Sequence, residues 1–488
     1  MTSAGGLAPR AGPLTRLFYG FGSIAFGVKD NGFQTFLLLF YNQVVGLRPE
    51  LSGLAILIAL AADAVLDPII GQFSDGLRTP WGRRHPLMYA TALPLGAAYL
   101  LLWRPPFDAS EAGKFWYLVA TAIGVRSLIS LYEAPSSALA PELTVDYAER
   151  TSLLGLRVFF AWLGGLAMYF LAFAVLLKPQ AGHAVGQLNA EGYARYGLIA
   201  GVVMTISILV SALGTHRLIP TFSKPEKRPG GGLRRYVSEM AETLRHGSFA
   251  VLLASNLFSA MATGVAFSMN LYFYTYVWRL STAQISIFAV VNLLAAGLGV
   301  MIARAASGED KKRSAIVLFL AGLAIVSAPL VGRLSGVFPE NGSPWLFPLL
   351  VGFSLVGLSP MIATSILTNS MIADLVEDSQ LRTGRRSEGL FFASSAFVSK
   401  AVSGFGVLIS GLILAGAGFP AKAGTALDPR AVDPEVLRRL ILLYLPVVSG
   451  LYVVAMVCLL GYRIDRRAHE ANLARLAASG QLPIIPEA

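Results

Sequence analysis

Two carboxylates one helical turn apart are the residues of this chain with the most telling chemistry. Asp63 and Asp67 lie within the apolar stretch 51–73, which reads LSGLAILIALAADAVLDPIIGQF. A charged side chain at the centre of a bilayer costs roughly 2.5–3.5 kcal/mol, and residues four apart share one face of a helix. Such a pair is tolerated where other charges match it or where it holds a mobile ion or proton. The stretch therefore predicts a membrane protein whose work involves a cation.

Six further charged side chains fall within apolar stretches. Together with Asp63 and Asp67 they make four acids and four bases, so the formal charges sum to zero. They are Lys29, Asp30, Arg126, Glu133, Arg157 and Lys400. Buried charges persist mainly by pairing, so a static network of salt bridges is one interpretation of the set. The alternative is a cation site made by Asp63, Asp67 and Glu133 with the hydroxyl of Ser130, because such oxygens suit a hard cation such as Na+. A buried carboxylate can instead carry a proton.

The remaining intramembrane charges suit a polar solute and the coupling of two halves of the protein. Lys29, Asp30, Glu133 and Arg157 offer donors and acceptors for a hydroxyl-rich ligand, although they can also pair with one another. Lys400, in SSAFVSKAVSGFG, is expected to compete with the cation for the carboxylates, or else to make one structural bridge. Arg126 is expected to be structural.

The composition indicates a polytopic membrane protein. Of 488 residues, 55% are hydrophobic and 14% are charged, against about 25% charged in an average soluble domain. The net charge of +11 lies mostly in short loops, which fits membrane orientation better than nucleic-acid binding. The single cysteine, Cys458, and the loop positions of the histidines give no catalytic cluster, so a membrane-embedded enzyme is disfavoured. No removable signal peptide is expected.

Twelve apolar stretches are long enough to span a bilayer as helices. They cover 17–46, 51–73, 86–104, 113–138, 152–177, 194–217, 249–277, 281–305, 313–332, 344–372, 387–417 and 436–462. We expect an all-α fold of two six-helix bundles, 1–217 and 249–462, joined by a cytoplasmic linker, 218–248, with a polar helix from Leu233 to Arg245. The excess of Lys and Arg on one side places both termini in the cytoplasm. Two halves of this kind are typical of secondary transporters.

Charged residues also gather at the predicted cytoplasmic mouth. They are Asp75, Arg78, Arg83 and Arg84 in the loop after the second stretch, and Asp146, Glu149 and Arg150 after the fourth. We expect these to form salt bridges that hold one conformation, or else to be solvated charges that enforce topology. The tail 463–488 reads as a short amphipathic helix, too small for the signalling domain that a sensor of this fold would carry.

Four ordered segments resemble the glycoside–pentoside–hexuronide:cation symporters (melibiose-permease-like proteins) of the major facilitator superfamily. They are YGFGSIAFGVKDNGFQTFLLLFYNQVVGL (19–47), DAVLDPIIGQFSDGLRTPWGRRHP (63–86), YEAPSSALAPELTVDYAERTSLLGLRVFF (132–160) and MIADLVEDSQLRTGRRSEGLFFASSAFVSKAVSG (371–404). The resemblance implies that Asp63, Asp67 and Glu133 are cation-site acids with Ser130 at a hydroxyl ligand position. It also implies that Asp30 and Arg157 bind sugar beside Lys29, and that Lys400 is a coupling lysine.

Two departures from the family pattern bear on the ligands. The family motif has Asn between the two acids where this chain has Leu66, and it has an aromatic residue for stacking on the sugar where this chain has Ser137. The first leaves sodium and protons both open as the coupling cation. We expect a monomeric bacterial inner-membrane symporter of a sugar or glycoside-like solute, without a cofactor. A lysophospholipid symporter of the same fold is the rival.

Overall fold

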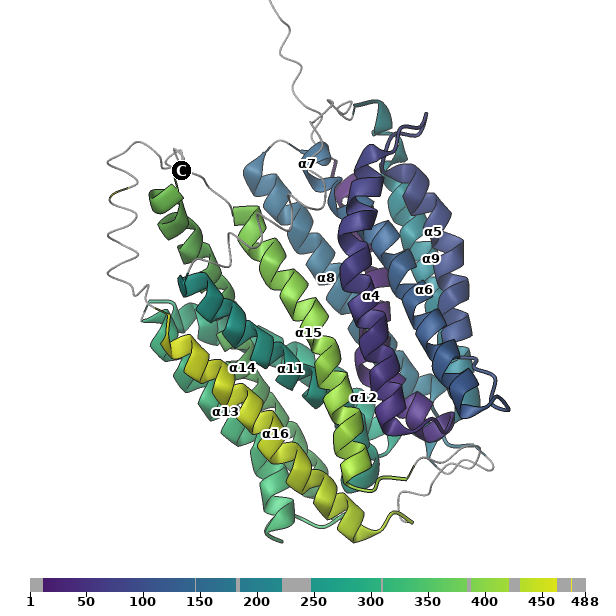
Figure 1. Ribbon diagram of the computed structural model, residues 1–488, viewed down its shortest axis with the longest axis vertical. Helices are drawn as coiled ribbons and strands as arrows, with labels where there is room; N and C mark the ends of the chain where they lie inside the picture. The colour runs from purple at the N-terminus through teal and green to yellow at the C-terminus, as the bar shows by residue number, and fades with distance from the viewer. Residues whose placement is uncertain are drawn as a thin grey trace, which may run out of the picture. The chain divides into compact units, whose positions relative to one another are not determined.

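Long helices dominate the described part of the chain, as the sequence predicts. The computed structural model describes residues 12–144, 146–180, 185–221, 247–308, 310–383, 388–420, 431–462 and 475 (Figure 1). The predicted polar helix of the linker and the predicted tail helix fall outside the described residues. The expected all-α class is confirmed.

Most helices begin and end within about six residues of the predicted stretches, but α14 continues to Thr383, beyond the predicted end at 372. Those of the first half of the sequence are α4 (Pro49–Gly76), α5 (His85–Leu102), α6 (Glu111–Ser137), α7 (Ala140–Leu143), α8 (Tyr147–Leu171) and α9 (Ala190–His216). Those of the second half are α11 (Gly247–Tyr272), α12 (Thr282–Ala306), α13 (Lys311–Leu334), α14 (Leu346–Thr383), α15 (Glu388–Gly416) and α16 (Pro434–Leu460). Side-chain oxygens of Ser110, Asn189 and Asp310 accept backbone N–H groups at the starts of α6, α9 and α13, which satisfies donors that a helix start leaves unpaired.

Among the described residues, ten helical stretches are long and apolar enough to cross a membrane. They are Pro49–Ser74, His85–Leu102, Glu111–Leu143, Glu149–Leu176, Ala190–His216, Gly247–Val277, Thr282–Ala306, Lys311–Leu334, Leu346–Leu375 and Pro434–Leu460. The two remaining predicted spans are also helical. One is α15, in which several side chains are outside the described set.

The other is the first predicted span, which changes helix type along its length. It runs through α1 (Pro13–Phe21), α2 (Ile24–Asn31), the π-helical η1 (Gly32–Phe36), α3 (Leu37–Leu39) and the π-helical η2 (Phe40–Val44). A π turn carries one extra residue and is frequent at functional sites. The predicted helix is therefore present but is divided into short pieces.

The end of this first helix is repeated at the end of α11. The π-helix η6 (Phe273–Val277) reads FYTYV where η2 reads FYNQV. The Leu47 amide donates to the Tyr41 carbonyl at 2.9 Å, and the Leu280 amide donates to the Tyr274 carbonyl at 2.8 Å. The residues before these leucines, Gly46 and Arg279, both have positive φ, 82° and 51°. The two halves of the sequence thus open with helices that end in the same way, as an internal repeat requires.

The chain packs as two compact units. Unit 1 comprises 1–230, 267–289 and 407–433, and unit 2 comprises 231–266, 290–406 and 434–488. Unit 1 therefore takes in two segments from the second half of the sequence, so its boundary differs from the predicted bundle boundary at 217/249. That predicted division of the chain stays a prediction.

Buried hydrogen bonds fix these two segments within unit 1. The Tyr272 hydroxyl donates to Asn42 Oδ1 at 3.0 Å, and the Tyr276 hydroxyl donates to Gln43 Oε1 at 2.8 Å. Gln43 Nε2 donates in turn to the Pro420 carbonyl at 2.8 Å. Each buried amide on η2 has a partner, as buried polar groups require.

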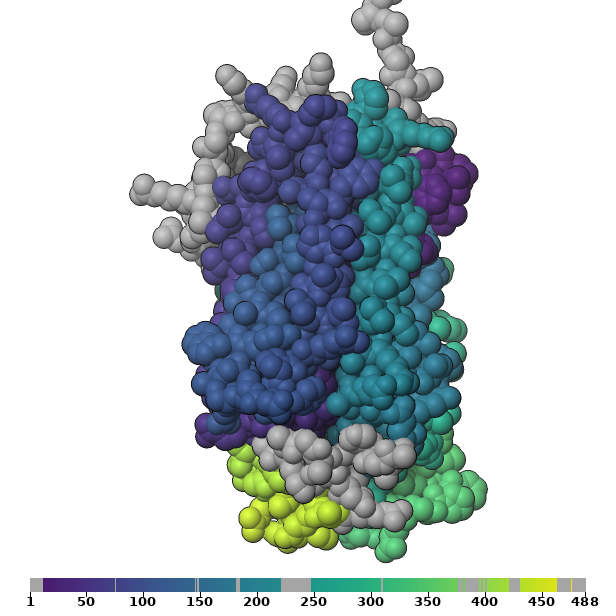
Figure 2. Space-filling view, turned by 90° about the vertical axis from the view of Figure 1, so that its right-hand side faces the viewer, coloured from purple at the N-terminus to yellow at the C-terminus, as the bar shows by residue number. Residues whose placement is uncertain are grey.

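The outer faces of the helices are apolar. Helices α5, α6 and α9 form much of the face in Figure 2. Their exposed side chains include Leu93, Trp116, Ile206 and Leu213, of which Leu93 is 73% exposed. Large apolar side chains exposed on several helices of one face are what a lipid bilayer covers.

Close helix packing in unit 1 depends on small residues, as in other membrane bundles. A Cβ atom added at Gly27 of α2 would lie 1.8 Å from the carbonyl oxygen of Ala161 in α8. No flexible side chain can relieve that clash, because the neighbour is backbone. Gly155, also in α8, has nothing within 4 Å of such an atom.

We predict that Gly27→Ala lowers the free energy of unfolding by about 1–3 kcal/mol, the usual cost of overpacking. Gly155→Ala is the matched control and is expected to be neutral or slightly stabilising, because Ala favours helix over Gly by up to ~1 kcal/mol. Melting temperatures of the purified variants in one detergent give the comparison. Equal melting temperatures for the two variants would contradict the packing described here.

Candidate functional site

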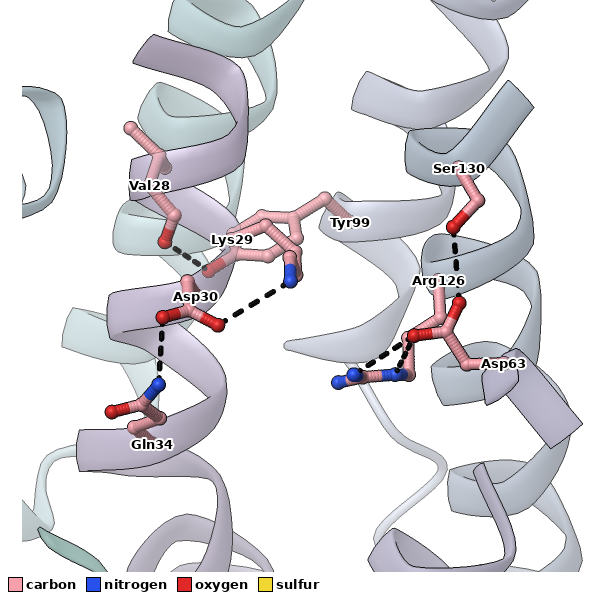
Figure 3. Close-up of polar contacts among 8 residues, drawn as sticks. All are labelled: Val28, Lys29, Asp30, Gln34, Asp63, Tyr99, Arg126 and Ser130. Carbon is pink, nitrogen blue, oxygen red and sulfur yellow. Dashed lines mark hydrogen bonds and ion pairs between the residues drawn. The ribbon is translucent and has the colours of Figure 1, made fainter. Parts of the chain in front are cut away.

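A buried ion pair joins α4 to α6 and contains the first of the two predicted acids. Asp63 is 2% exposed and Arg126 is 4% exposed. Arg126 Nε donates to Asp63 Oδ2 at 2.9 Å, and Ser130 Oγ donates to Asp63 Oδ1 at 3.0 Å. Both carboxylate oxygens are therefore occupied, one by a guanidinium and one by a hydroxyl (Figure 3).

The guanidinium also contacts the first helix. Its central carbon lies 5.3 Å from the ring centre of Phe33 in η1, a cation–π distance. In Figure 3 Arg126 and Lys29 extend from opposite sides into the region between α2 and α6. A buried pair contributes little net stability, but removing one partner leaves an expensive uncompensated charge.

Asp67 follows Asp63 by one turn on the same face of α4 and is half-buried. The next residue, Pro68, lies inside the helix. Proline has no N–H, so the Ala64 carbonyl loses its usual helical donor. The turn between the two acids therefore presents a backbone oxygen as well as carboxylates, a ligand set that suits a hard cation.

A second charged group lies on α2. Lys29 is buried, and its Nζ lies 3.4 Å from Asp30 Oδ1 and 4.4 Å from the ring centre of Phe26. Gln34 Nε2 donates to the other oxygen of Asp30 at 2.6 Å. Asp30 is only half-buried, so this group combines a buried cation with a carboxylate that a ligand can reach.

A third charged group joins α6 to α8. Arg157 makes an ion pair with Glu133 and donates from Nη1 to Ser136 Oγ at 2.6 Å. The guanidinium carbon also lies 5.4 Å from the ring centre of Tyr19. The other oxygen of Glu133, Oε1, is buried and accepts no hydrogen bond within the described part of the chain.

One face of α6 thus carries Arg126, Ser130 and Glu133, at spacings of four and three residues. Asp63 and Glu133 each have an arginine partner. No group of three or more acidic, histidine or cysteine side chains close enough to hold a metal occurs among the described residues. The expected joint site of Asp63, Asp67, Glu133 and Ser130 stays a prediction, and the hydrogen bond from Ser130 to Asp63 joins two of its members.

Three of the charged residues predicted to lie at the cytoplasmic mouth, Arg83, Arg84 and Glu149, take part in two ion-pair clusters. Arg83 Nε donates to Glu142 Oε1 at 3.1 Å, and Arg84 Nε lies 3.5 Å from the same oxygen. Glu149 pairs with Arg16 and accepts a hydrogen bond from Thr144 at 2.6 Å.

The other predicted mouth residues have different positions. Asp146 caps α8, because its Oδ1 accepts from the Glu149 amide at 2.9 Å. Arg78 is exposed, and Arg150 Nε is buried without a hydrogen-bond partner in the described structure. The side chains of Asp75 and Lys400 lie outside the described residues.

Sequence reasoning missed several partners. Arg126 was expected to be structural and had no assigned partner, and the structure pairs it with the first acid of the motif. Glu142 and Arg16 were not singled out, although each completes an ion pair with a predicted residue. The spacing of Arg126 and Ser130, one turn apart, was the available signal, because it places both on the face that meets α4.

The fold and the site together define a polytopic α-helical membrane protein with a charged interior. The profile of the MFS/sugar transport protein family matches residues 18–466. The chain therefore belongs to that family and is a multi-pass integral membrane transporter, which confirms the resemblance found in the sequence.

Individual relatives agree with this family. The isoprimeverose transporter of Lactiplantibacillus pentosus is 24% identical over 92% of this chain and 88% of its own length. The inner membrane symporter YicJ of Escherichia coli (strain K12) is 24% identical over 83% of each chain. The sodium-dependent lysophosphatidylcholine symporter 1 of Gallus gallus is 24% identical over 94% of this chain and 88% of its own.

A solved structure shares the fold. A bacterial homologue of the human lysosomal transporter Spinster superposes with a TM-score of 0.63 at 14% identity, covering 94% of this chain and 97% of that one.

The ion pair predicts a specific pattern of stabilities. Asp63→Asn is expected to lower the free energy of unfolding by about 3–5 kcal/mol, because it leaves the Arg126 guanidinium buried without this carboxylate. The double variant Asp63→Asn/Arg126→Gln is expected to recover part of that loss. Thermal unfolding of the wild type, of Asp63→Asn, of Arg126→Gln and of the double variant gives the coupling energy between the two side chains. Losses that simply add would show that the two side chains do not interact.

Proposed function

We propose that the protein is a cation-coupled symporter that moves a sugar or glycoside-like solute by alternating access. The buried Asp63–Arg126–Ser130 group carries the proposal, together with the family. An acid buried between apolar helices, beside a second acid one turn away, is the arrangement that binds and releases a cation. The coupling ion is Na+ or H+, both of which suit these oxygens.

In this mechanism Arg126 is the resident partner of Asp63 when no cation is bound. A cation that enters at Asp63 and Asp67 replaces the guanidinium on the carboxylate. Arg126 lies against Phe33 of η1, which follows directly after the helix that bears Lys29 and Asp30. The exchange thus alters the charge facing the first helix, and cation binding thereby changes the affinity for solute.

The solute site in this proposal lies at Lys29–Asp30 and at Glu133–Arg157. Asp30 is half-buried, and Glu133 Oε1 lacks a hydrogen-bond donor in the described structure. Carboxylates and a guanidinium are good partners for vicinal hydroxyl groups. The relative named as an isoprimeverose transporter supports a sugar-like solute.

A lysophospholipid is the second candidate solute, because a relative named as a lysophosphatidylcholine symporter matches most of the chain. Competition experiments distinguish the two. If an unlabelled sugar blocks cation-dependent uptake of a labelled sugar and lysophosphatidylcholine does not, the sugar-like solute is supported. The reverse result supports the lysophospholipid.

We also infer that the chain crosses a bacterial inner membrane twelve times. Both of its termini then lie on the cytoplasmic side. The stretch from Pro13 to Val44 and helix α15 supply the two spans beyond the ten long apolar helical stretches described above. The relative named as an inner membrane symporter supports the membrane.

Uptake into membrane vesicles tests the coupling. Asp67→Asn is expected to reduce cation-driven accumulation of solute roughly tenfold or more, because the carrier loses the charge that makes the loaded state differ from the empty one. Passive exchange of solute across the membrane is expected to continue.

The matched control is Asp108→Asn, which neutralises an exposed acid and is expected to leave accumulation unchanged. Sodium and proton gradients are imposed separately, so the same assay identifies the cation. Full gradient-dependent accumulation by Asp67→Asn would overturn the proposed role of the acid pair.

A further inference from the structure

Aromatic and basic side chains gather on the outside of unit 1, where α5 begins and α9 ends. They are Trp81, Tyr89 and His216, which we call the Trp81 cluster, and Arg217, which follows His216 in the chain. Trp81 and Arg217 are exposed, and Tyr89 and His216 are half-buried. The two helices run side by side over the face in Figure 2. The proposed orientation places this end of them at the cytoplasmic leaflet.

Ring contacts and a hydrogen bond hold the Trp81 cluster together. The Trp81 ring lies edge to face against the rings of Tyr89 and His216, with ring centres 5.9 and 6.3 Å apart. The Tyr89 hydroxyl and His216 Nδ1 share a hydrogen bond at 3.0 Å. With the hydroxyl as donor, the neutral imidazole carries its proton on Nε2. His216 then has an N–H group to offer a ligand.

Arg217 continues the lipid-facing side of α9. Exposed apolar residues follow one another along one face of this helix, at Leu198, Val202, Ile206 and Leu213. Arg217 lies four residues beyond Leu213 and keeps helical dihedral angles, with φ −61° and ψ −17°. A rise of 1.5 Å per residue places it about 16 Å from Ile206 along the helix axis, close to half the thickness of the hydrocarbon core. The face from Arg217 to Ile206 therefore has the length of one lipid leaflet.

An anionic phospholipid matches this face at both of its ends. A guanidinium binds a phosphate through two parallel hydrogen bonds, and the imidazole N–H can donate to the same group. Tryptophan and tyrosine side chains favour the level of the lipid headgroups, and acyl chains pack on the apolar side of α9. A zwitterionic headgroup carries its own cation beside the phosphate, so it gains less from Arg217. The charge of the face thus selects an anionic lipid.

We propose that Arg217 and the Trp81 cluster bind the phosphate of an anionic phospholipid, such as phosphatidylglycerol, whose acyl chain lies along α9 from Leu213 towards Ile206. The site is on the outside of unit 1 and includes none of the residues of the proposed cation and solute sites. It rests on the proposed function only for the leaflet that supplies the lipid, because binding here requires neither the cation nor the solute.

Native mass spectrometry of the purified full-length protein tests the proposal, with phosphatidylglycerol and phosphatidylcholine titrated separately. The wild type is expected to bind phosphatidylglycerol about fivefold more tightly, the factor that one cationic side chain contributes at an anionic surface. Arg217→Gln is expected to abolish this preference and to leave phosphatidylcholine binding unchanged, which also shows that the variant is folded. His216→Leu is expected to weaken phosphatidylglycerol binding about two- to tenfold, the range for one hydrogen bond.

Two controls separate a lipid site from general attraction between basic residues and anions. Arg304, near the end of α12 in unit 2, is also exposed and follows the exposed apolar residues Leu298 and Met301. Arg304→Gln is therefore the matched variant, and it is expected to keep the wild-type preference for phosphatidylglycerol. Glycerol 3-phosphate, which has the phosphate without acyl chains, is expected not to compete with the lipid.

Three results would overturn the proposal. The wild type may bind the two lipids equally, or Arg217→Gln and Arg304→Gln may lower the preference by the same factor. Competition by glycerol 3-phosphate at the concentration of the lipid would show a site for free phosphate instead. None of these results bears on cation-coupled transport, because binding is measured without a gradient or a solute.

Discussion

The ion pair between Asp63 and Arg126 is the interaction on which the interior of unit 1 depends. Both side chains are almost fully buried, and each would be too costly alone in an apolar bundle. The pair therefore holds α4 against α6 in one register, with Ser130 completing the carboxylate's hydrogen bonds. Because the guanidinium also lies over Phe33, the same charge is shared with the first helix. Any ion that takes Arg126's place on Asp63 acts on three helices together.

The two units differ in how they use polarity. In unit 1 the polar interior consists of charges matched in pairs, with Glu133 and Arg157 as a second example. In unit 2 a cavity is lined mainly by hydroxyl and amide side chains among the described residues. The part-buried Lys311–Asp374 contact, at 2.7 Å, is an ion pair, but neither residue lines that cavity. Ion pairs thus lie in the interior of unit 1, and hydroxyl and amide groups line the cavity of unit 2.

The helices could be predicted closely from the sequence, because a bilayer demands about 20 apolar residues in a row and such runs are easy to recognise. The predicted stretch 113–138, for example, is α6, Glu111–Ser137. The π turns of the first helix could not be predicted, since they depend on packing against neighbours rather than on hydropathy. The repeat of FYNQV and FYTYV was visible in the sequence and was overlooked, because five residues carry little weight until their matching hydrogen bonds are known.

The candidate site was predictable as a set of residues but not as a set of contacts. Asp63, Ser130 and Glu133 were all singled out, yet pairing is decided by which helix faces meet, and the sequence does not contain that geometry. Arg126 illustrates the difficulty, since its charge was counted correctly and its partner was not. Glu142 was missed because an acid in a polar loop looks like any solvated charge until Arg83 and Arg84 are seen beside it.

The central claim is that Arg126 and the coupling cation compete for Asp63. The direct measurement is the affinity of the purified protein for Na+ and for protons, obtained from cation-dependent thermal stabilisation, in the wild type and in Arg126→Gln, with Asp63→Asn as the control that removes the site. If the arginine must leave before the cation binds, its removal tightens apparent cation affinity by roughly tenfold or more, and Asp63→Asn shows no response. An affinity that is unchanged or weaker in Arg126→Gln would contradict the account.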